Sequence, residues 1–578
     1  MKMINLKVNG IAVQVPEGTT ILEAAKAAKV EIPSLCYLKD VNKIGACRIC
    51  MVEIKGRRGV VASCVYPVEE GIEVLTNTPA IRASRKMTLE LIVANHDKTC
   101  LSCVRSNSCE LQRLCNEYGV EEDKFEPTVN DYKIDTTSAY IVRDNNKCIL
   151  CRRCIAACGD TQGIGVIGAI GRGQKTHIGC AFEKGMGEVA CVGCGQCIVA
   201  CPVGALKERT HEEDVWDAIA DPDKKVLVFT APSIKATLGE AFDLPVGTNV
   251  EGKMVAAIRR LGVDQVFDMD FTADLTIMEE AHEFLDRVKN GGKLPLITSC
   301  SPGWVKFCEH YYPEFLSNLS TCKSPQQMFG AILKTYYAEK NGLDPNNIFV
   351  VSVIPCTAKK FEVTRDEQKR ESMQDVDVAL TTRELARMIK RAAIKFNELP
   401  DEAYDLPFEV GSGAGAIFGA TGGVMEAALR TASHWLDGDF EKLEFNEVRG
   451  TEGIKEATYN VAGIEVKVAV TSGLANARKV LDSVKSGEKE YHIIEIMACP
   501  GGCVNGGGQP TLSDSIRNNV DVRSLRASAL YDIDENRAVR MSHENPAIKT
   551  IYDEFLGEVG GHKSHELLHT TYVEREKF

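Results

Sequence analysis

Residues 497–503 read Met497-Ala-Cys499-Pro-Gly-Gly-Cys503, and they set how the rest of the chain is interpreted. They directly follow the apolar run Ile493-Ile-Glu-Ile496, which is typical of a buried strand. The Pro-Gly-Gly turn allows positive φ angles and lets the backbone come close to a bound group. We therefore expect two thiolates at the end of a strand, where they can hold a metal centre.

The composition limits the class of protein. With 578 residues, of which 44% are apolar, the chain is long enough for about three to four domains. Its net charge of −13 disfavours nucleic acid as a partner, because no basic stripe could displace counterions from a phosphate backbone. No apolar run reaches the ~18 residues of a membrane span and no leader-like segment is apparent, so we expect a cytoplasmic protein without a membrane anchor.

Cysteine is unusually abundant, with 23 residues in the chain. Disulfides are rare in a reducing cytoplasm, so metal binding is the default interpretation. The spacing of the cysteines then decides between zinc and iron-sulfur clusters.

The first part of the chain, residues 1–80, combines a hairpin, a helix and four cysteines. Apolar residues alternate on both sides of Asn9-Gly10, and Thr20 with Glu23 forms a predicted capping box for a following helix. The cysteines are Cys36, Cys47, Cys50 and Cys64. Zinc would accept four such ligands, but this order of elements resembles a plant-type ferredoxin with a lengthened first gap, which implies a β-grasp domain with a 2Fe-2S cluster. The basic turn at 55–59 is either a solvated hairpin tip or a contact for an acidic electron carrier.

Residues 81–126 carry a helix followed by the spacing His-x3-Cys-x2-Cys-x5-Cys. The four residues are His96, Cys100, Cys103 and Cys109. A zinc knuckle is the alternative, but the spacing resembles the His/Cys3 4Fe-4S site of multi-cluster hydrogenases, formate dehydrogenases and respiratory NADH dehydrogenase. Cys115 fits no pattern and is interpreted as a buried thiol.

Residues 127–210 contain two copies of the motif Cys-x2-Cys-x2-Cys-x3-Cys, which resemble a bacterial two-cluster ferredoxin. The resemblance implies that the fourth cysteine of each copy crosses over to the other cluster. One 4Fe-4S cluster would then be held by Cys148, Cys151, Cys154 and Cys201, and the other by Cys158, Cys191, Cys194 and Cys197. Cys180 and His177, between the copies, receive no ligand role.

Beyond residue 210 the pattern changes to apolar runs separated by helical stretches, which predicts an α/β region with largely parallel strands. Sites in such sheets lie beyond the carboxyl ends of the strands. Cys300, Cys356 and Cys499 each follow an apolar run, and Cys503 comes four residues later. Two singletons and a Cys-x3-Cys are unusual for structural zinc, so the alternatives are one shared buried site or separate buried thiols.

Three motifs in this region resemble the signatures of the iron-only, or di-iron, hydrogenases of the multi-cluster clostridial type. They are Thr298-Ser-Cys300-Ser-Pro-Gly-Trp304, Pro355-Cys356-Thr-Ala-Lys359-Lys-Phe-Glu362 and Met497-Ala-Cys499-Pro-Gly-Gly-Cys503. The resemblance implies an H-cluster, in which a 4Fe-4S cubane is joined through Cys503 to a di-iron subsite with CO, cyanide and a bridging dithiolate. It also implies that Lys359 donates to a cyanide ligand, and that the cofactor is lined by Ala231, Pro232, Ser233, Ser324, Gln326, Ile354, Phe418 and Met497.

The first motif departs from the family at position 301. The family has two adjacent cysteines there, a proton carrier followed by a cubane ligand, and this chain has Cys300 followed by Ser301. We expect Cys300 to be the proton carrier and Cys322 to replace the lost thiolate, joining Cys356, Cys499 and Cys503. Cys300 or Ser301 as the fourth ligand remains the alternative.

The family also implies a proton path that ends at Cys300. Glu280, Ser320, Glu283 and Arg287 match it in type and order. Glu280, Glu283 and Arg287 are three and four residues apart and so share one helix face. The alternative is a solvated salt-bridge face.

The sequence therefore predicts a multidomain chain of α+β and α/β parts. These parts are a β-grasp ferredoxin domain at 1–80, a His/Cys3 cluster domain at 81–126, a two-cluster ferredoxin domain at 127–210 and a large α/β catalytic domain at 211–578. By resemblance, the protein interconverts H2 with protons and electrons, using one 2Fe-2S, three accessory 4Fe-4S clusters and the H-cluster.

Two settings fit this function: a single-chain enzyme with ferredoxin, or the catalytic subunit of an NAD(P)- and ferredoxin-linked bifurcating complex. The pattern at Ser301 and Cys322 resembles the second group, which implies flavoprotein subunits as partners. In either setting the family resemblance implies maturation proteins that insert the di-iron part. A non-catalytic iron-sulfur electron carrier or sensor is the rival class. Such a protein would have no need of Lys359 or of the carboxylate path.

Overall fold

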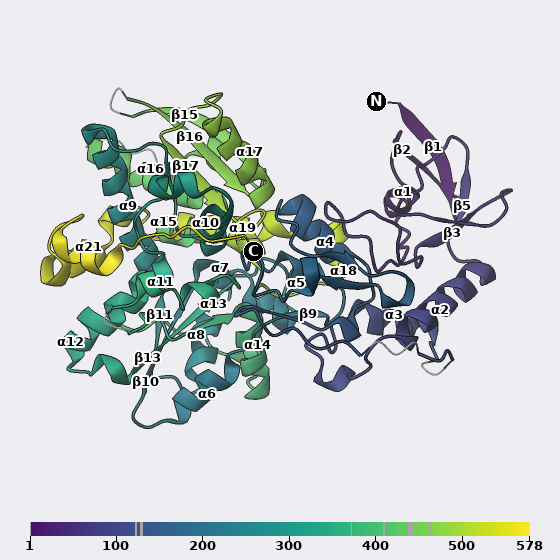
Figure 1. Cartoon of the computed structure of the whole chain (residues 1–578), viewed down its shortest axis with the longest axis horizontal. Coiled ribbons are helices and arrows are strands. Elements are labelled where there is room, and N and C mark those ends of the chain that lie inside the picture. The colour runs from purple at the N-terminus through teal and green to yellow at the C-terminus, as the bar shows by residue number, and fades with distance from the viewer. Residues whose placement is uncertain are drawn as a thin grey trace.

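The computed structural model describes residues 2–121, 124–127, 131–370, 373–408, 411–436, 444–461 and 464–577. Figure 1 shows an elongated molecule in which the N-terminal sheet lies at one end and two further sheets with their helices lie at the other. The segment between about residues 140 and 210 connects the two ends. Across the described residues, no helix is both long and apolar enough to traverse a bilayer.

The N-terminal sheet has the strand order β2-β1-β5-β3-β4. Its strands are β1 (Met3–Val8), β2 (Ile11–Pro16), β3 (Met51–Ile54), β4 (Val60–Ala62) and β5 (Glu73–Leu75). The predicted hairpin is confirmed, since β1 and β2 pair antiparallel around Asn9 and Gly10. Helix α1 (Ile21–Ala27) begins after Thr20, whose hydroxyl accepts from the Glu23 amide. The Glu23 carboxylate accepts from Lys26 and Tyr37, so only half of the predicted capping box forms among the described hydrogen bonds.

Short elements surround the predicted cluster loops. Helices α2 (Pro79–Ala94) and α3 (Glu110–Tyr118) flank the loop with His96 and three cysteines. Each Cys-x2-Cys-x2-Cys run leads into a short helix, α4 (Arg153–Ala156) or α5 (Gln196–Ala200). Two antiparallel pairs complete this part: β6 (Ile141–Arg143) with β9 (Leu206–Glu208), and β7 (Gly168–Ile170) with β8 (His177–Gly179).

The catalytic region contains two four-stranded sheets. The first has the order β11-β10-β13-β14, and all its pairs are parallel. Its strands are β10 (Lys225–Thr230), β11 (Gln265–Asp268), β13 (Ile348–Ile354) and β14 (Val378–Thr381). The second has the order β12-β17-β16-β15, with β12 (Leu296–Ile297), β15 (Ile454–Val461), β16 (Ile464–Ser472) and β17 (Ile493–Met497). Parallel strands are thus confirmed, but the division into two sheets was not predicted, because strand periodicity does not specify which strands pair.

Helices cover both sheets. They are α6 (Glu212–Ala220), α7 (Pro232–Lys235), α8 (Glu251–Arg259), α9 (Asp270–Asn290), α10 (Pro302–Tyr311), α11 (Pro325–Ile332), α12 (Ala338–Asn341), α13 (Lys359–Glu362), α14 (Thr382–Arg391), α15 (Gly413–Ala416), α16 (Gly423–Leu436), α17 (Leu474–Lys485), α18 (Asp514–Asn519), α19 (Val522–Asn536), α20 (Pro546–Ile551) and α21 (His562–Leu568). Helix α9 is buried along most of its length, and it packs against α11, α15 and α16. Its buried residues include carboxyl groups as well as apolar side chains, so α9 carries ionisable groups into the interior.

The C-terminal segment returns across the catalytic region (Figure 1). His569 pairs with Cys322 in an isolated antiparallel bridge, and the Tyr572 hydroxyl donates to the Ser320 carbonyl at 2.6 Å. Further on, Arg575 binds the Glu309 carboxylate at 2.7 Å. The segment therefore fixes the 320–322 stretch from outside.

Candidate active site

A cavity lies where the carboxyl ends of strands from both sheets meet. Cys300 follows β12 and Cys499 follows β17 in one sheet, whereas Cys356 follows β13 in the other. The position agrees with the rule that α/β sites lie beyond strand ends, but two sheets rather than one supply it.

The cavity is lined by residues that fit a cubane at one end. Cys356, Cys499, Cys503 and Ser301 all line it, and the Ser301 hydroxyl accepts from the Ala498 amide at 3.3 Å. Burial raises the pKa of the Cys503 thiol to about 12 and raises that of Cys356 as well. Without a cation these thiols would stay protonated, so the donor set suits an iron cluster, which stabilises thiolates.

A glycine allows the turn between two of these thiols. Gly502 has a φ of +95°, and a Cβ there would lie 2.6 Å from the Thr421 amide nitrogen. The Pro-Gly-Gly turn thus needs both positive φ and close backbone approach, as the sequence predicts.

Cys300 also lines the cavity. It packs against Phe418 and Met497, together with Ala273 and Ile277 of α9. Burial raises the pKa of the Cys300 thiol well above its usual range, and the nearby Glu280 carboxylate raises it further. A buried neutral thiol between the cavity and a carboxylate is suited to pass a proton between them.

Cys322 requires a correction. The predicted fourth cubane ligand is not among the residues that line the cavity. Its thiol lies 3.9 Å from Glu283 Oε2, and burial followed by the Glu283 carboxylate raises its pKa well above the usual range. The segment around it resembles the family sequence, but its backbone turns the side chain toward α9 instead of toward the cavity.

The predicted proton carriers form a connected row on α9 and the neighbouring loop. The Ser320 hydroxyl donates to Glu283 Oε2 at 3.2 Å, and Arg287 Nη2 donates to Glu283 Oε1 at 2.5 Å. The Glu283 and Arg287 side chains are 14% and 12% exposed, whereas Glu280 is 1% exposed. The row therefore runs from near the surface to the interior, which a solvated salt-bridge face would not do.

Glu280 is the innermost carboxyl of this row. Its Oε2 has no hydrogen-bond partner among the described residues. The Glu280 carboxylate is also close enough to Cys300 to raise the pKa of that thiol. Burial raises the pKa of Glu280 to about 8, although the Ser320 hydroxyl acts in the opposite direction. At neutral pH the carboxyl is protonated and can donate.

Lys359 lines the cavity and is held by Glu362. Lys359 Nζ donates to Glu362 Oε2 at 2.8 Å, and the same oxygen accepts from Ser324 at 2.9 Å and from Gln326 Nε2 at 3.0 Å. Ser324 therefore contacts Glu362 and is not itself among the lining residues, unlike Gln326. The role of Glu362 was missed from the sequence, although its i,i+3 spacing from Lys359 was a usable signal.

The remaining predicted lining residues reach the cavity as expected. They are Ala231, Pro232 and Ser233 at α7, Ile354 at the end of β13, Phe418 and Met497. Glu495 was not predicted. Its buried carboxylate accepts from the amides of Gly422 and Met425 at 2.6 and 2.7 Å, and so fixes the glycine-rich turn beside the cavity to β17.

The four N-terminal cysteines converge. Cys50 and Cys64 Sγ atoms lie 3.3 Å apart, and the Cys47 amide donates to the Cys36 sulfur at 3.5 Å. The thiols of Cys36 and Cys47 are also close enough to form a hydrogen bond, which lowers the pKa of Cys36. This geometry is compact enough for a small cluster.

The eight cysteines of the ferredoxin motifs separate into two groups as the resemblance implies. Cys148, Cys151, Cys154 and Cys201 line one small cavity. Burial raises the pKa of the Cys194 and Cys197 thiols well above the usual range. Cys191 and Cys158 lie close enough to raise both pKa values further. The fourth cysteine of each copy therefore lies with the other copy.

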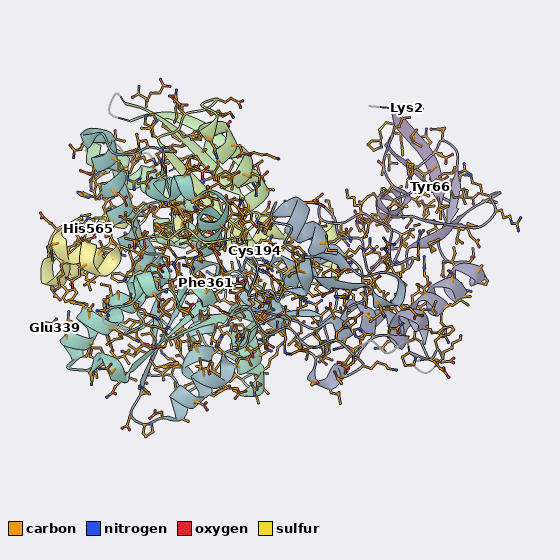
Figure 2. All side chains as sticks on the ribbon, viewed as in Figure 1. Lys2, Tyr66, Cys194, Glu339, Phe361 and His565 are labelled. Atoms are coloured by element: carbon orange, nitrogen blue, oxygen red, sulfur yellow. The ribbon has the colours of Figure 1, made fainter. Side chains whose placement is uncertain are left out.

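Cys194 also lines the catalytic cavity, which brings the second group next to it. The Cys499 sulfur lies 4.0 Å from the Cys194 carbonyl, and Thr357 donates to the Gly193 carbonyl at 2.5 Å. A Cβ on Gly507 would lie 2.3 Å from that same Cys194 oxygen, so the contact depends on glycine. Figure 2 shows Cys194 where the ferredoxin-like part meets the catalytic part.

The His96 loop lies beyond the other group. Cys103 Sγ is close to Gly204, since a Cβ on that glycine would lie 2.5 Å from it, and Cys109 Sγ is 4.0 Å from the Pro202 carbonyl. The His96 Nδ1 is buried without a hydrogen-bond partner among the described residues, and burial lowers the pKa of the ring. An unpaired buried nitrogen near three cysteines fits a cluster ligand.

The residues without a predicted role have other contacts. Cys180 receives a hydrogen bond from Arg143 at 3.7 Å, and His177 Nε2 contacts Glu183 at 3.0 Å. Cys115, which was predicted to be buried, is only partly buried and packs against the hydrophobic core that surrounds the ferredoxin motifs. In the basic turn, Arg57 pairs with Glu69 at 2.6 Å, which reduces its availability to an acidic partner.

Comparison with known proteins identifies the family. Residues 224–507 match the model "Iron only hydrogenase large subunit, C-terminal domain", and residues 520–575 match "Iron hydrogenase small subunit". The chain is 46% identical over 589 residues to the NADP-reducing hydrogenase subunit HndD of Solidesulfovibrio fructosivorans, with 100% of both chains covered. The chain belongs to the iron-only hydrogenases.

Other relatives agree. Iron hydrogenase 1 of Clostridium pasteurianum is 44% identical over 573 residues, covering 99% of this hydrogenase and 100% of that protein. An apo-form variant of the FeFe-hydrogenase HydA1 of Chlamydomonas reinhardtii superposes with a TM-score of 0.58 at 40% identity, covering 64% of this chain and 100% of that one.

The N-terminal matches explain the remaining third of the chain. Residues 1–79 match a 2Fe-2S iron-sulfur cluster binding domain and residues 85–124 the NADH-ubiquinone oxidoreductase-G iron-sulfur binding region. Residues 138–207 match the ferredoxin-like domain of NADH-quinone oxidoreductase subunit 3. The hydrogenase thus joins an H-cluster domain to 2Fe-2S and 4Fe-4S binding domains, and it is an oxidoreductase acting on H2.

Proposed function

We propose that this hydrogenase is the catalytic subunit of a larger NAD(P)-linked assembly, in which it interconverts H2 with protons and electrons. The observation that carries the catalytic part is one cavity lined by Cys356, Cys499, Cys503, Lys359 and Cys300, with the Glu280 carboxyl near Cys300. The decisive experiment is infrared spectroscopy of the matured protein, together with H2 evolution from a reduced viologen. Absorption from metal-bound CO and cyanide and turnover are both expected.

The rival class makes the opposite prediction. An iron-sulfur electron carrier or sensor would show neither infrared bands nor turnover after maturation. The row of Glu280, Ser320, Glu283 and Arg287 favours the enzyme, because a carrier of electrons alone has no use for buried proton donors.

The cavity residues divide the work of holding the cofactor. When bound, the H-cluster supplies the metal centre at which H2 is split or formed and the outlet for its electrons. Cys356, Cys499 and Cys503 would anchor the cubane, and Cys503 would also reach the di-iron subsite. Lys359, held by Glu362, would donate to a cyanide ligand, while Phe418, Met497 and Ile354 exclude water and Gln326 and Ser233 supply polar contacts.

Ser301 is the residue that we propose as the fourth cubane ligand, through its oxygen. It lines the cavity at the motif position where the family has a cysteine ligand, and Cys300 holds the position of the family's proton carrier. Apo protein carrying only the cubane provides the test, since it can be followed by electron paramagnetic resonance and potentiometry. Ser301→Cys should change both the spectrum and the midpoint potential. A Ser301→Ala protein with an unchanged spectrum and potential would assign the position to another ligand.

Protons would pass along residues of the chain itself. Arg287 and Glu283 stand at the outer end, the Ser320 hydroxyl connects Glu283 with Glu280, and Cys300 delivers or accepts the proton at the cavity. Because Glu280 is protonated at neutral pH and the Cys300 thiol is neutral, a concerted shift, in which each group donates one proton as it receives another, would leave both groups neutral. Such a shift avoids creating a charge in the buried part of the path.

Electrons would pass through the accessory clusters. We propose the domain division 1–80, 81–126, 127–210 and 211–578, which the family matches support. The cluster on Cys158, Cys191, Cys194 and Cys197 would be the last before the cubane, because Cys194 lines the catalytic cavity. The cluster on Cys148, Cys151, Cys154 and Cys201 precedes it, and the His96 and 2Fe-2S sites lie further out.

The partners are inferred from the relatives. HndD is named as a subunit of an NADP-reducing hydrogenase, and two N-terminal segments match parts of NADH dehydrogenases. No flavin or nucleotide motif was found in the sequence, so flavoprotein subunits, alone or with ferredoxin, would supply NAD(P) chemistry. Copurification of flavoprotein subunits with the native protein is expected. A lone chain that exchanges electrons only with ferredoxin would support the single-chain setting.

The cellular setting follows from the same chemistry. The described cysteines are free thiols, which suits a reducing compartment, and we propose the cytoplasm. Dedicated maturation proteins are expected to insert the di-iron part. Nucleic acid is not expected as a partner of a chain with a net charge of −13.

A further inference from the structure

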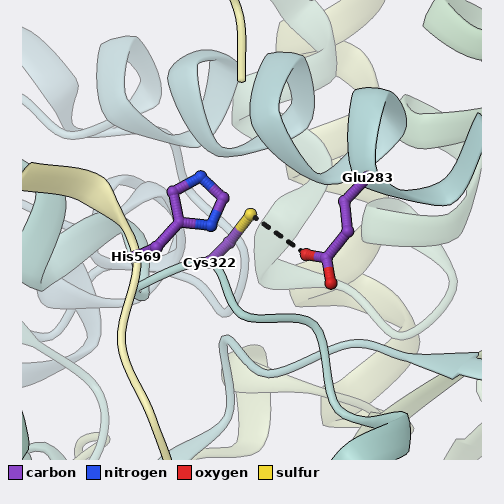
Figure 3. A group of neighbouring side chains, drawn as sticks. All are labelled: Glu283, Cys322 and His569. Carbon is purple, nitrogen blue, oxygen red and sulfur yellow. Dashed lines mark hydrogen bonds between the residues drawn. The ribbon is translucent and has the colours of Figure 1, made fainter. Parts of the chain in front are cut away.

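Three possible metal ligands lie together beside the outer end of the proposed proton path. They are Glu283 of α9, Cys322 of the 320–324 segment and His569 after α21 (Figure 3). A carboxylate oxygen, the sulfur and a ring nitrogen all lie within 4.8 Å of one another. Three different ligand types brought together from three distant segments are more specific than a group of acidic residues.

The distances are close to those of a bound ion. With Zn–S near 2.3 Å and Zn–N or Zn–O near 2.1 Å, tetrahedral ligands lie about 3.4 to 3.6 Å apart. Cys322 Sγ and Glu283 Oε2 are already 3.9 Å apart (Figure 3). The His569 ring nitrogen supplies the third ligand atom, within 4.8 Å of the other two.

The surroundings of His569 resemble those of a zinc ligand. Its Nε2 contacts Glu279 Oε2 at 3.2 Å, and that carboxylate is fixed by Tyr552 and by the Gly560 amide at 3.0 Å. A carboxylate behind an imidazole orients the ring and increases its basicity toward a metal. Nδ1 lies on the ligand side, 2.8 Å from the Thr321 hydroxyl.

The charges also favour a cation. The Glu283 and Glu279 carboxylates of α9 lie near Cys322, and Arg287 binds Glu283 through Oε1. Glu283 Oε2 remains on the Cys322 side. Thr321 or a water would provide a fourth oxygen.

We propose that Glu283, Cys322 and His569 bind a divalent transition-metal ion of the zinc class, and that the ion inhibits turnover by occupying Glu283. Binding replaces the thiol proton of Cys322 by the metal and releases that proton to solvent. Glu283 Oε2 is the atom that accepts from Ser320, so the ion takes the contact that continues the path inward. The inhibitory part rests on the proposed proton path, but the binding part does not.

Binding is tested on the fully matured protein, with zinc chloride as the probe. Zinc X-ray absorption of the washed protein should show one bound ion with one sulfur and otherwise nitrogen or oxygen neighbours. Cys322→Ala and the nearly isosteric Cys322→Ser should lose that sulfur. Cys308→Ala removes an equally buried thiol in α10 and should leave the zinc spectrum unchanged. An unchanged sulfur shell in both Cys322 variants would overturn the site.

Inhibition is tested by H2 evolution from reduced viologen, with and without zinc. Zinc should lower the H2 evolution rate of the native protein at least tenfold, and a chelator should restore that rate. Cys322→Ala should have the native rate without zinc and lose less than twofold when zinc is added. Equal inhibition of Cys322→Ala and native protein would overturn the inhibitory role. If zinc binds at Cys322 but turnover is unaffected, the proton path through Glu283 is wrong while the metal site stands.

Discussion

Glu280 provides the sharpest test of the proton path. Its carboxyl is buried and lies between Ser320 and Cys300, so Glu280→Gln keeps the shape and removes the transferable proton. Positioned proton donors contribute about 10²–10⁴ to the rate of a reaction. H2 evolution should therefore fall at least a hundredfold, while the CO and cyanide bands remain.

The pKa of Glu280 gives the pH dependence. The native carboxyl is protonated below about 8, so H2 evolution should decrease as pH rises through 8, when the carrier loses its proton. The same shift affects stability. Because the folded pKa is raised, the contribution of Glu280 to stability is greatest below the unfolded pKa and is lost as pH rises through the folded pKa.

The magnitude follows from the shift. A change from 4.5 to about 8 corresponds to roughly 5 kcal/mol as an upper limit, at 1.36 kcal/mol per pH unit. An unsatisfied buried amide in the glutamine variant costs about 1–3 kcal/mol at every pH. The variant should thus unfold at a lower temperature than the native protein at pH 5. At pH 9 its unfolding temperature should approach or exceed that of the native protein.

Thermal unfolding of native and variant protein between pH 5 and 9 provides the measurement, with Glu279→Gln as a matched control on the neighbouring residue. Two results would refute the reasoning. One is a Glu280→Gln protein that retains more than half of the native rate, and the other is a difference in midpoint temperature that does not change with pH.

Two further predictions concern the cofactor and the relay. Glu362→Gln should hold Lys359 and Gln326 less firmly, because a neutral amide replaces the carboxylate that binds both. We expect shifted cyanide bands and at least a tenfold lower rate of H2 evolution. Unchanged bands would exclude a role of Glu362 in positioning Lys359. Gly507→Ala would place a methyl group 2.3 Å from the Cys194 carbonyl and separate the last accessory cluster from the cubane. The rate of H2 oxidation with a fast acceptor at the outer clusters should fall several-fold, and equal rates in the native and variant proteins would show that this contact does not control electron transfer.

Much of the site was available from residue spacing. Metal ligands on one short loop are adjacent because the chain itself holds them together, so the groups at His96 and at the Cys-x2-Cys runs were predictable. Strand ends at Cys356 and Cys499 were predictable for a related reason, since an apolar run followed by a turn fixes where a side chain emerges. The position of Glu362 could have been read from its i,i+3 spacing to Lys359.

Cys322 shows the limit of such reasoning. Its sequence context matched a segment near the cofactor, and the count of thiolates favoured it as a ligand. Whether a side chain points into the cavity or toward α9 depends on the path of the backbone, which the bridge from Cys322 to His569 and the Tyr572 contact fix from almost 250 residues away.

The sequence by itself therefore determined the family, the kinds of cluster and the two thiols of residues 497–503, because these depend on local spacing and turn chemistry. Only the tertiary structure decided that two sheets share one cavity, that Ser301 rather than Cys322 faces it, and that Cys194 lies against it. The physical reason is that these contacts join segments far apart in the chain. Strand pairing, burial and close glycine contacts specify such contacts, and no local pattern encodes them.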